Sequence, residues 1–221
     1  MRHNDSSKAE LPSSAIGPSG RPETVGGVCE ARAVDWTSEV QVYGGALDWV
    51  GQLISATPMQ SLERSTPCGD YDVRALIGHL IGTAERSLGT AQQRSTRDIP
   101  HVVVDVVDAD LADRYLMLSK LIKASWADVG AATEMTAPWG RCSAQDAVRG
   151  FTIETLVHGW DLAVATGQPE EAPGGLAAAV LPHVDSVIPA GTRSRMYGAS
   201  VAPAEGSGST QQLAFILGRN R

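Results

Sequence analysis

Glu154 and His158 are the residues whose types and spacing point most directly to chemistry. They are four positions apart, so on a helix their side chains lie one turn above the other on the same face. Their neighbours Phe151, Val157 and Leu162 are apolar, and a carboxylate and an imidazole are costly to bury without partners. A metal ion satisfies both groups, because a carboxylate oxygen and a neutral imidazole nitrogen are standard ligands of zinc and similar ions.

His79 offers a third ligand, since it flanks the apolar stripe of another predicted helix beside Leu76 and Leu80. Two helices that both direct an imidazole inward favour one site between them. The alternatives are an ion pair between Glu154 and His158 and histidines that are simply packed in the core. We predict a metal site of His79, Glu154 and His158.

Asp161 continues the same helix face three residues beyond His158. It either holds a ligand histidine in one tautomer or lies at the surface near the helix end, and the sequence does not separate these interpretations. Trp139 and Trp160 are expected to pack in the core, with a role in a pocket wall as the alternative.

The remaining histidines and two of the cysteines are expected to have no catalytic or ligand role. His3 is near the start of the chain, His101 is in a connection and His183 is on a separate predicted helix. Cys68 belongs to a turn. Cys142 precedes a helix start, a placement that can lower a thiol pKa but is common and nonspecific. We therefore interpret both cysteines as structural.

The apolar spacing places these residues on helices. It predicts helices at about 35–57, 73–92, 108–129, 143–166, 175–188 and 210–217. The fourth begins with Ser143 and Asp146 in a capping-box pattern and ends at Gly167. It is apolar nearly all round, which is typical of a helix in the middle of a bundle. No segment alternates convincingly as a strand, so the predicted fold is all-α.

The composition and net charge of the chain disfavour some classes of binding partner. The chain has 221 residues and a formal net charge of −7, with its basic residues scattered, which disfavours nucleic acid and anionic membranes. No apolar run approaches the roughly 20 residues of a membrane span, and the first residues lack the apolar stretch of a secretory signal. Three widely separated cysteines predict no disulfide framework. We expect a cytoplasmic protein with a small-molecule substrate, and the sequence leaves a homodimer open.

Two motifs resemble a known family. The stretches 66–68 and 71–76, followed by His79, and the stretches 154–163 and 165–168, resemble the DinB-like superfamily. More narrowly, they are similar to its branch with the mycothiol-dependent maleylpyruvate isomerase N-terminal domain. Residues 213–219 look like the usual ending of that branch.

The resemblance implies an up-down-down-up four-helix bundle with a divalent metal near one end, held at the positions of His79, Glu154 and His158. It implies zinc or nickel with an open position, and mycothiol or another small thiol as co-substrate. Close relatives carry prolines before the C-terminal helix that residues 196–201 lack, so substrate preference is expected to differ if that loop rims the pocket.

Three protein ligands leave a position for a reactant, which is the arrangement of catalytic zinc sites. A thiol at that position loses its proton, so we predict a thiol-dependent transferase or isomerase that acts on a small electrophile. The alternatives are a hydrolase that activates water, for which no unassigned carboxylate stands out as the base, and a non-catalytic metal-binding or stress-response protein.

The sequence predicts three regions along the chain. Residues 1–33 are rich in Ser, Pro and Gly and are expected to form a disordered arm. Residues 34–170 are expected to form the metal-binding bundle. Residues 171–221 are expected to form a helical extension packed on it.

Overall fold

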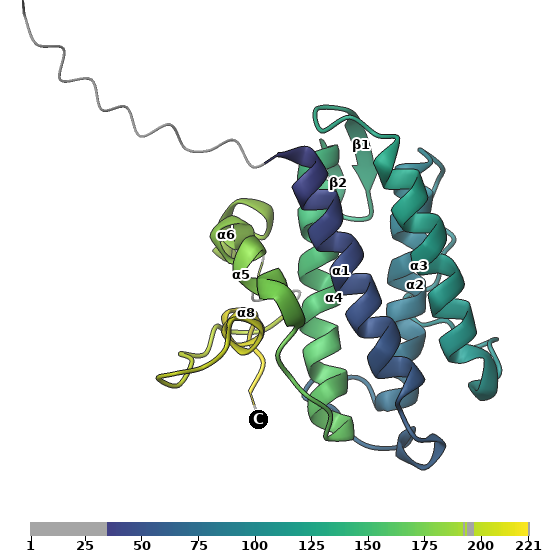
Figure 1. The fold of residues 1–221 in the computed structure, drawn as a ribbon, viewed down its shortest axis with the longest axis vertical. Coiled ribbons are helices and arrows are strands. Elements are labelled where there is room, and N and C mark those ends of the chain that lie inside the picture. The colour runs from purple at the N-terminus through teal and green to yellow at the C-terminus, as the bar shows by residue number, and fades with distance from the viewer. Residues whose placement is uncertain (1–34, 192, 194–196, 221) are drawn as a thin grey trace, which may run out of the picture. The chain divides into compact units, whose positions relative to one another are not determined.

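The computed structural model describes residues 35–191, 193 and 197–220. The expected disordered arm, residues 1–33, lies outside the described residues. The described chain is mostly helical, with one small sheet (Figure 1). Its helices and strands are α1 (Trp36–Ser55), α2 (Val73–Ala91), α3 (Leu111–Ala127), β1 (Glu134–Ala137), β2 (Gly140–Ser143), α4 (Ala144–Thr166), α5 (Leu176–Val180), α6 (Val184–Val187) and α8 (Ser209–Ile216). Short 3-10 turns lie at Met59–Ser61, Asp108–Asp110, Pro173–Gly175 and Leu181–His183.

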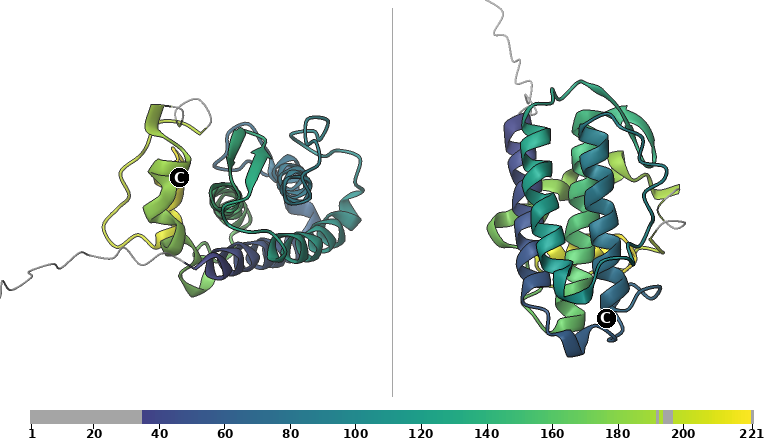
Figure 2. Two further views of the ribbon diagram at one scale, coloured as in Figure 1. Left: turned by 90° about the horizontal axis from the view of Figure 1, so that it is seen from above. Right: turned by 90° about the vertical axis from the view of Figure 1, so that its right-hand side faces the viewer.

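The four long helices α1 to α4 lie side by side (Figures 1 and 2). Helices α1 and α2 each contact both α3 and α4. The indole nitrogen of Trp36, at the start of α1, donates to the carbonyl of Val129 just after α3, so these two helices run in opposite directions. The interior between the long helices is one apolar cluster that includes the fully buried Tyr43, Trp126 and Phe151.

Helix α4 begins and ends as its sequence predicts. The Ser143 hydroxyl accepts from the backbone N–H of Asp146 at 3.1 Å. Gly167 closes the helix with a φ of 71°, a left-handed conformation that glycine adopts without a steric penalty. Helix α4 contacts α1 and α2 as well as both strands, α5, α6 and α8. Neighbours around most of its circumference explain why nearly every face of this helix is apolar.

Two predictions about local structure are wrong. Strands β1 and β2 pair antiparallel where no strand was expected, because only Met135 and Ala137 of β1 are buried and so short an alternation is inconspicuous. The predicted helix 175–188 is divided into α5 and α6 by a 3-10 turn that contains Pro182. Proline lacks the backbone N–H that a continuous helix requires at this position.

The C-terminal segment lies against α4. Helices α5, α6 and α8 all contact α4, and α5 also contacts α1 and α8. Trp160 of α4 is fully buried and packs edge-on against Phe215 of α8, with ring centroids 5.9 Å apart. No helix among the described residues combines the length and the apolar character that crossing a membrane requires.

Candidate metal centre

The three predicted ligands meet between α2 and α4. The Nε2 atom of His158 lies 3.4 Å from Oε2 of Glu154, and Nε2 of His79 lies 3.9 Å from the same oxygen. One potential ligand atom from each residue lies within 4.8 Å of the others. Two ligands at zinc distances in a tetrahedron are about 3.3 to 3.4 Å apart, so only a small contraction separates this arrangement from coordination geometry.

Each histidine is oriented through its outer nitrogen. The Nδ1 atom of His79 is 3.0 Å from the carbonyl oxygen of His101, and Nδ1 of His158 is 3.0 Å from Oδ2 of Asp161. Both partners are acceptors, so each Nδ1 carries the proton, and Nε2 of a neutral ring carries the lone pair. Within the described residues, Nε2 of His79 is buried without a hydrogen-bond partner. An unpaired buried acceptor beside a carboxylate fits a metal ligand.

The surroundings shift the pKa values of the two histidines in opposite directions. Burial lowers the pKa of His79, which therefore stays neutral at neutral pH. Burial favours protonation of Glu154, but the adjacent imidazoles of His158 and His79 hold the pKa of that carboxyl well below its usual range. Burial opposes the charged form of His158, but hydrogen bonds to Asp161, Cys68 and Glu154 raise its pKa well above the ordinary value.

Asp161 is fully buried, so the interpretation that placed it at the surface is wrong. Its carboxylate accepts from Nδ1 of His158 and from Nε of Arg219, both at 3.0 Å through Oδ2. A carboxylate behind a ligand histidine fixes the tautomer and increases the basicity of the ligating nitrogen. Asp161 is therefore placed to position His158.

Two residues at the site were missed as functional residues. The hydroxyl of Tyr197 donates to Oε1 of Glu154, and burial together with this carboxylate raises the pKa of Tyr197 well above its ordinary value. Arg219 binds the buried Asp161. Neither residue stands in a periodic pattern with α4, and the family-like ending of the chain was the only signal that included Arg219.

Cys68 also lies at the site, although the sequence indicated only a turn. Its sulfur, His158 and Asp161 form a second group of potential ligand atoms within 4.8 Å of one another. However, Nη2 of Arg219 lies 3.5 Å from that sulfur and Nε binds Asp161, so a guanidinium cation already occupies this side. Like-charge repulsion disfavours a metal ion there. We therefore favour the group formed by His79, Glu154 and His158.

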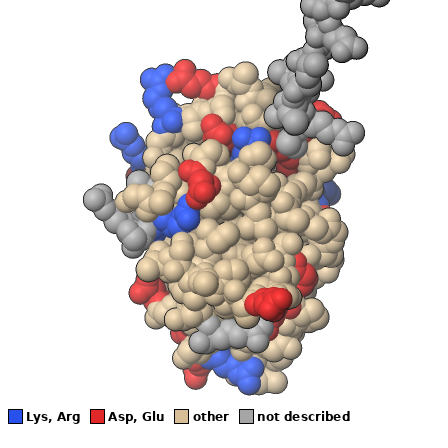
Figure 3. All heavy atoms as spheres, turned by 90° about the vertical axis from the view of Figure 1, so that its left-hand side faces the viewer, with Lys and Arg blue, Asp and Glu red and all other residues tan. Residues whose placement is uncertain are grey.

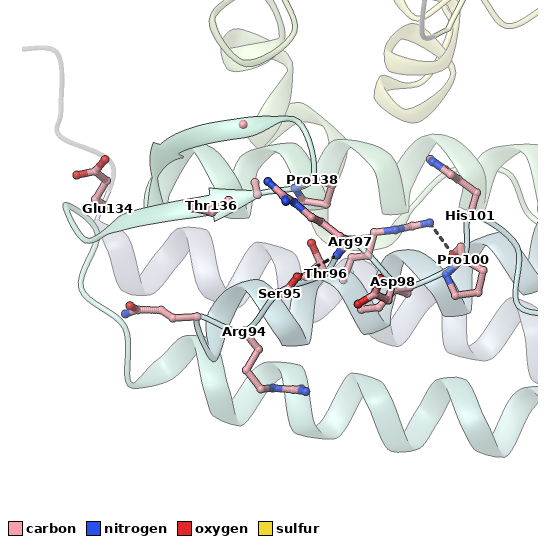
Figure 4. Close-up of a pocket in the computed structure, with 15 residues that line it drawn as sticks. Arg94, Ser95, Thr96, Arg97, Asp98, Pro100, His101, Glu134, Thr136 and Pro138 are labelled. Atoms are coloured by element: carbon pink, nitrogen blue, oxygen red, sulfur yellow. Dashed lines mark hydrogen bonds between the residues drawn. The ribbon is translucent and has the colours of Figure 1, made fainter.

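Two cavities adjoin the centre, and Trp139 lines both. One, of about 220 Å³, includes Glu154 and Tyr197 in its lining, and the other, of about 170 Å³, includes His79 and Glu154. Trp139 is 39% exposed, so it forms part of a pocket wall, whereas the buried Trp160 packs in the core. A larger open groove of about 830 Å³ is lined by residues 93–101 and part of the β hairpin (Figure 4).

The remaining histidines and Cys142 are not among the favoured ligands. His101 is among the lining residues of the smaller cavity, and its carbonyl orients His79. His183 and Cys142 belong to neither group of potential ligands, and His3 lies outside the described residues. On the face drawn in Figure 3, basic side chains are interspersed with acidic ones and form no continuous stripe.

Sequence comparison identifies the family. The model of the mycothiol maleylpyruvate isomerase N-terminal domain matches residues 45–163, which is more than half of the chain and includes all three candidate ligands. Comparisons with curated proteins and with solved structures give no match. The chain therefore belongs to the mycothiol maleylpyruvate isomerase N-terminal domain family, within the DinB-like superfamily.

Proposed function

We propose that this protein is a metal-dependent enzyme that uses a small thiol to modify a small electrophilic substrate. The observation that carries the proposal is the convergence of two imidazole Nε2 atoms on one carboxylate, with one of them buried and unpaired. Family membership supports the same conclusion, because the family is named after the N-terminal domain of a mycothiol maleylpyruvate isomerase.

His79, Glu154 and His158 would hold the metal ion, through two imidazole nitrogens and one carboxylate oxygen. This donor set suits zinc, and nickel is the alternative. When bound with an open position, the metal supplies a Lewis acid that lowers the pKa of a thiol and so provides a thiolate at neutral pH.

The two carboxylate oxygens of Glu154 face different partners. Oε2 faces both histidines, and Oε1 accepts from the hydroxyl of Tyr197. The raised pKa of Tyr197 keeps that hydroxyl protonated, so it remains a donor over the whole neutral range. The hydrogen bond restrains rotation of the carboxylate and keeps Oε2 directed at the histidines.

Two outcomes are consistent with such a site. In conjugation, the thiol sulfur bonds to an electrophilic carbon, the leaving group departs with the electron pair of its broken bond, and the thiol proton passes to solvent. In isomerisation, the sulfur adds to one carbon of a double bond conjugated to a carbonyl, whose oxygen takes up the negative charge. Rotation about the resulting single bond and cleavage of the sulfur–carbon bond then restore the double bond and the thiolate.

Hydrolysis is less well supported. Activation of water needs a general base near the metal, and among the described residues Glu154 is the only carboxylate that lines either adjoining cavity. Since Glu154 is engaged by both histidines and by Tyr197, no acidic side chain is left for that role in the described lining of these cavities.

We also infer that α1 to α4 form the up-down-down-up bundle of the DinB-like superfamily. The contact of Gln92 with Ser125 joins the ends of α2 and α3, so these helices run in the same direction. Arg149 near the start of α4 binds Glu39 near the start of α1, so this pair is parallel as well. Because α1 and α3 are antiparallel, the four directions follow the order that this topology requires.

Metal content tests the centre without a substrate. Purified wild-type protein is expected to hold close to one zinc or nickel ion per chain by elemental analysis. The variants His79→Ala, Glu154→Ala and His158→Ala are expected to lose it, while His183→Ala, which alters a histidine away from the centre, should retain it. Equal metal content in all five proteins would contradict the proposal.

Turnover tests the reaction. The metal-loaded protein is incubated with mycothiol or cysteine and with monobromobimane as the electrophile, and the fluorescent thioether is measured. We expect thiol-dependent turnover that His79→Ala abolishes. Product formed from the electrophile without thiol would indicate hydrolysis, and no turnover in either assay would indicate a non-catalytic metal-binding protein.

A further inference from the structure

Helix α8 ends in a Schellman motif just before Arg219. The backbone N–H of Gly218 donates to the carbonyl of Phe215 at 3.0 Å, and the backbone N–H of Arg219 donates to the carbonyl of Ala214 at 3.0 Å. This pair of hydrogen bonds requires a left-handed residue at the turn, a conformation that glycine adopts without a steric penalty. Gly218 has a φ of +78°. The end of α8 therefore sets the direction in which Arg219 leaves the helix.

Gly218 lies directly against Gly198. A Cβ atom at Gly218 would lie 2.7 Å from the carbonyl carbon of Gly198 and 2.8 Å from its Cα atom, which is closer than a side chain can approach a backbone. Gly198 also has a positive φ, of +129°. The two glycines thus let residues 197–201 and 215–219 meet backbone to backbone, and we call this pair of segments the C-terminal clamp.

Further contacts join the two segments of the C-terminal clamp. The backbone N–H of Val201 donates to the carbonyl of Phe215 at 2.8 Å. At the other end, Nη1 of Arg219 donates to the carbonyl of Tyr197 at 3.3 Å, and the guanidinium carbon lies 6.0 Å from the centre of the Tyr197 ring. A shift of either segment therefore breaks bonds to the other.

Each segment of the C-terminal clamp supplies one support of the metal centre. Tyr197 donates to Oε1 of Glu154 from one segment. Arg219 binds Asp161 from the other, and Asp161 accepts from Nδ1 of His158. Both supporting residues are next in sequence to a glycine of the backbone contact. One point of contact between the segments thus lies behind two of the three candidate ligands.

From this geometry we propose that the contact of Gly198 with Gly218 couples Tyr197 and Arg219 into a single positioning unit for Glu154 and His158. This inference rests on the proposed function, because it concerns how the proposed metal ligands are oriented. The two glycines act on the ligands through the side chains next to them and are positioning residues. Loss of one support is expected to loosen the other as well.

The first test compares two glycines with nearly the same backbone conformation. Gly206 has a φ of +81°, but a Cβ atom there would have nothing within 4 Å. Gly218→Ala and Gly206→Ala therefore impose similar backbone strain, and only Gly218→Ala drives the two segments apart. We expect Gly218→Ala to lower zinc affinity about tenfold, and Gly206→Ala to leave it within about twofold, by competition with a chelating indicator. Equal affinities in the two variants would overturn the role of the glycine contact.

A double-mutant cycle tests the coupling and leaves both glycines in place. Tyr197→Phe removes the hydroxyl donor, and Arg219→Met removes the guanidinium. If the two supports form one unit, the first substitution already loosens what the second would release. The fall in zinc affinity of the double variant should then be clearly smaller than the product of the two single falls. Fold-changes that multiply would show independent supports and overturn the inference.

Urea unfolding of the same variants without metal separates this inference from the proposed function. Absence of zinc binding in the wild type would contradict the proposed function, yet the metal-free cycle would still measure the coupling. We expect the double variant to lose less unfolding free energy than the two single variants together. Tyr197→Phe combined with Leu121→Ala, an exposed change on α3, is the control and should be additive. Additive losses for Tyr197→Phe with Arg219→Met would overturn the inference with or without metal.

Discussion

His158 is held between two carboxylates. Glu154 faces its Nε2 atom, and Asp161 accepts from its Nδ1 atom. This arrangement fixes both the orientation of the ring and the nitrogen that carries the lone pair. His79 is oriented more weakly, by the backbone carbonyl of His101. Side-chain substitution can therefore remove the orienting group of His158 but not that of His79.

Replacement of Asp161 tests this positioning role. In Asp161→Asn the amide oxygen still accepts a hydrogen bond but the negative charge is lost, so zinc affinity should fall about 10-fold to 100-fold. The measurement is competition of zinc with a chelating indicator. Arg149→Met breaks a different buried ion pair, with Glu39, and should leave the affinity unchanged. Equal affinities in wild type and Asp161→Asn would exclude a role for the carboxylate in orienting His158.

The pKa of His158 predicts how metal affinity depends on pH. This pKa is raised well above its ordinary value, so the ring is protonated at neutral pH, whereas a ligand imidazole must be neutral. The lowered pKa of His79 means that this ring is already neutral and releases no proton. Zinc binding should therefore release one proton, and affinity should rise about tenfold from about pH 6.5 to about pH 7.5. Zinc titrations across this range test the slope, and a flat profile would contradict it.

At the scale of elements, α4 does most of the positioning. It carries Glu154, His158 and Asp161, receives the indole of Trp139 at Gly150, and contacts the long helices α1 and α2 as well as both strands. The close approach of α1 depends on Gly159, where an added Cβ would lie 2.5 Å from Cζ3 of Trp49. The small residue lets the two helices pack tightly beside the ligands.

Gly159→Ala should therefore destabilise the fold. The new methyl group must displace the ring of Trp49 in a packed interior, at a cost of about 1 to 3 kcal/mol. Urea unfolding of the metal-free protein measures this change. Gly69→Ala adds a methyl group where nothing lies within 4 Å, so its effect should stay within about 0.5 kcal/mol. Equal midpoints for the two variants would show that α1 and α4 adjust without strain.

At the scale of the whole molecule, the C-terminal segment completes the centre. Arg219 reaches Asp161 across 58 positions of sequence, and Tyr197 reaches Glu154 across 43. Both residues of this ion pair are buried: Asp161 is 0% exposed and Arg219 is 5% exposed. The described ending of the chain is therefore part of the support of the candidate ligands.

Loss of one partner of this ion pair should cost more than loss of both. Arg219→Met leaves the carboxylate of Asp161 buried with one cationic partner fewer, which should lower the free energy of unfolding by about 3 kcal/mol. The double variant Asp161→Asn with Arg219→Met removes the unpaired charge and should recover a large part of that loss. Chemical unfolding of the four proteins forms a double-mutant cycle. Additive effects would show that the two side chains do not interact.

The sequence by itself determined the helices and the three candidate ligands. The spacing of apolar residues placed α1 to α4 within a few residues of their observed bounds, because helical periodicity is a local property. The same periodicity put Glu154 and His158 on one face and His79 beside the apolar stripe of α2, and the family motifs pointed to the same three residues. The sequence could not distinguish a surface Asp161 from a buried one, since that depends on what covers α4.

Only the tertiary structure decided what surrounds those ligands. Tyr197, Arg219 and Cys68 reach the centre through contacts between segments far apart in the chain, and no local pattern encodes such contacts. The place of Trp139 between two cavities depends on a hairpin too short to produce a clear alternation and on the absence of a side chain at Gly150. Local spacing thus determined which residues face inward, and packing between distant segments determined which groups they meet.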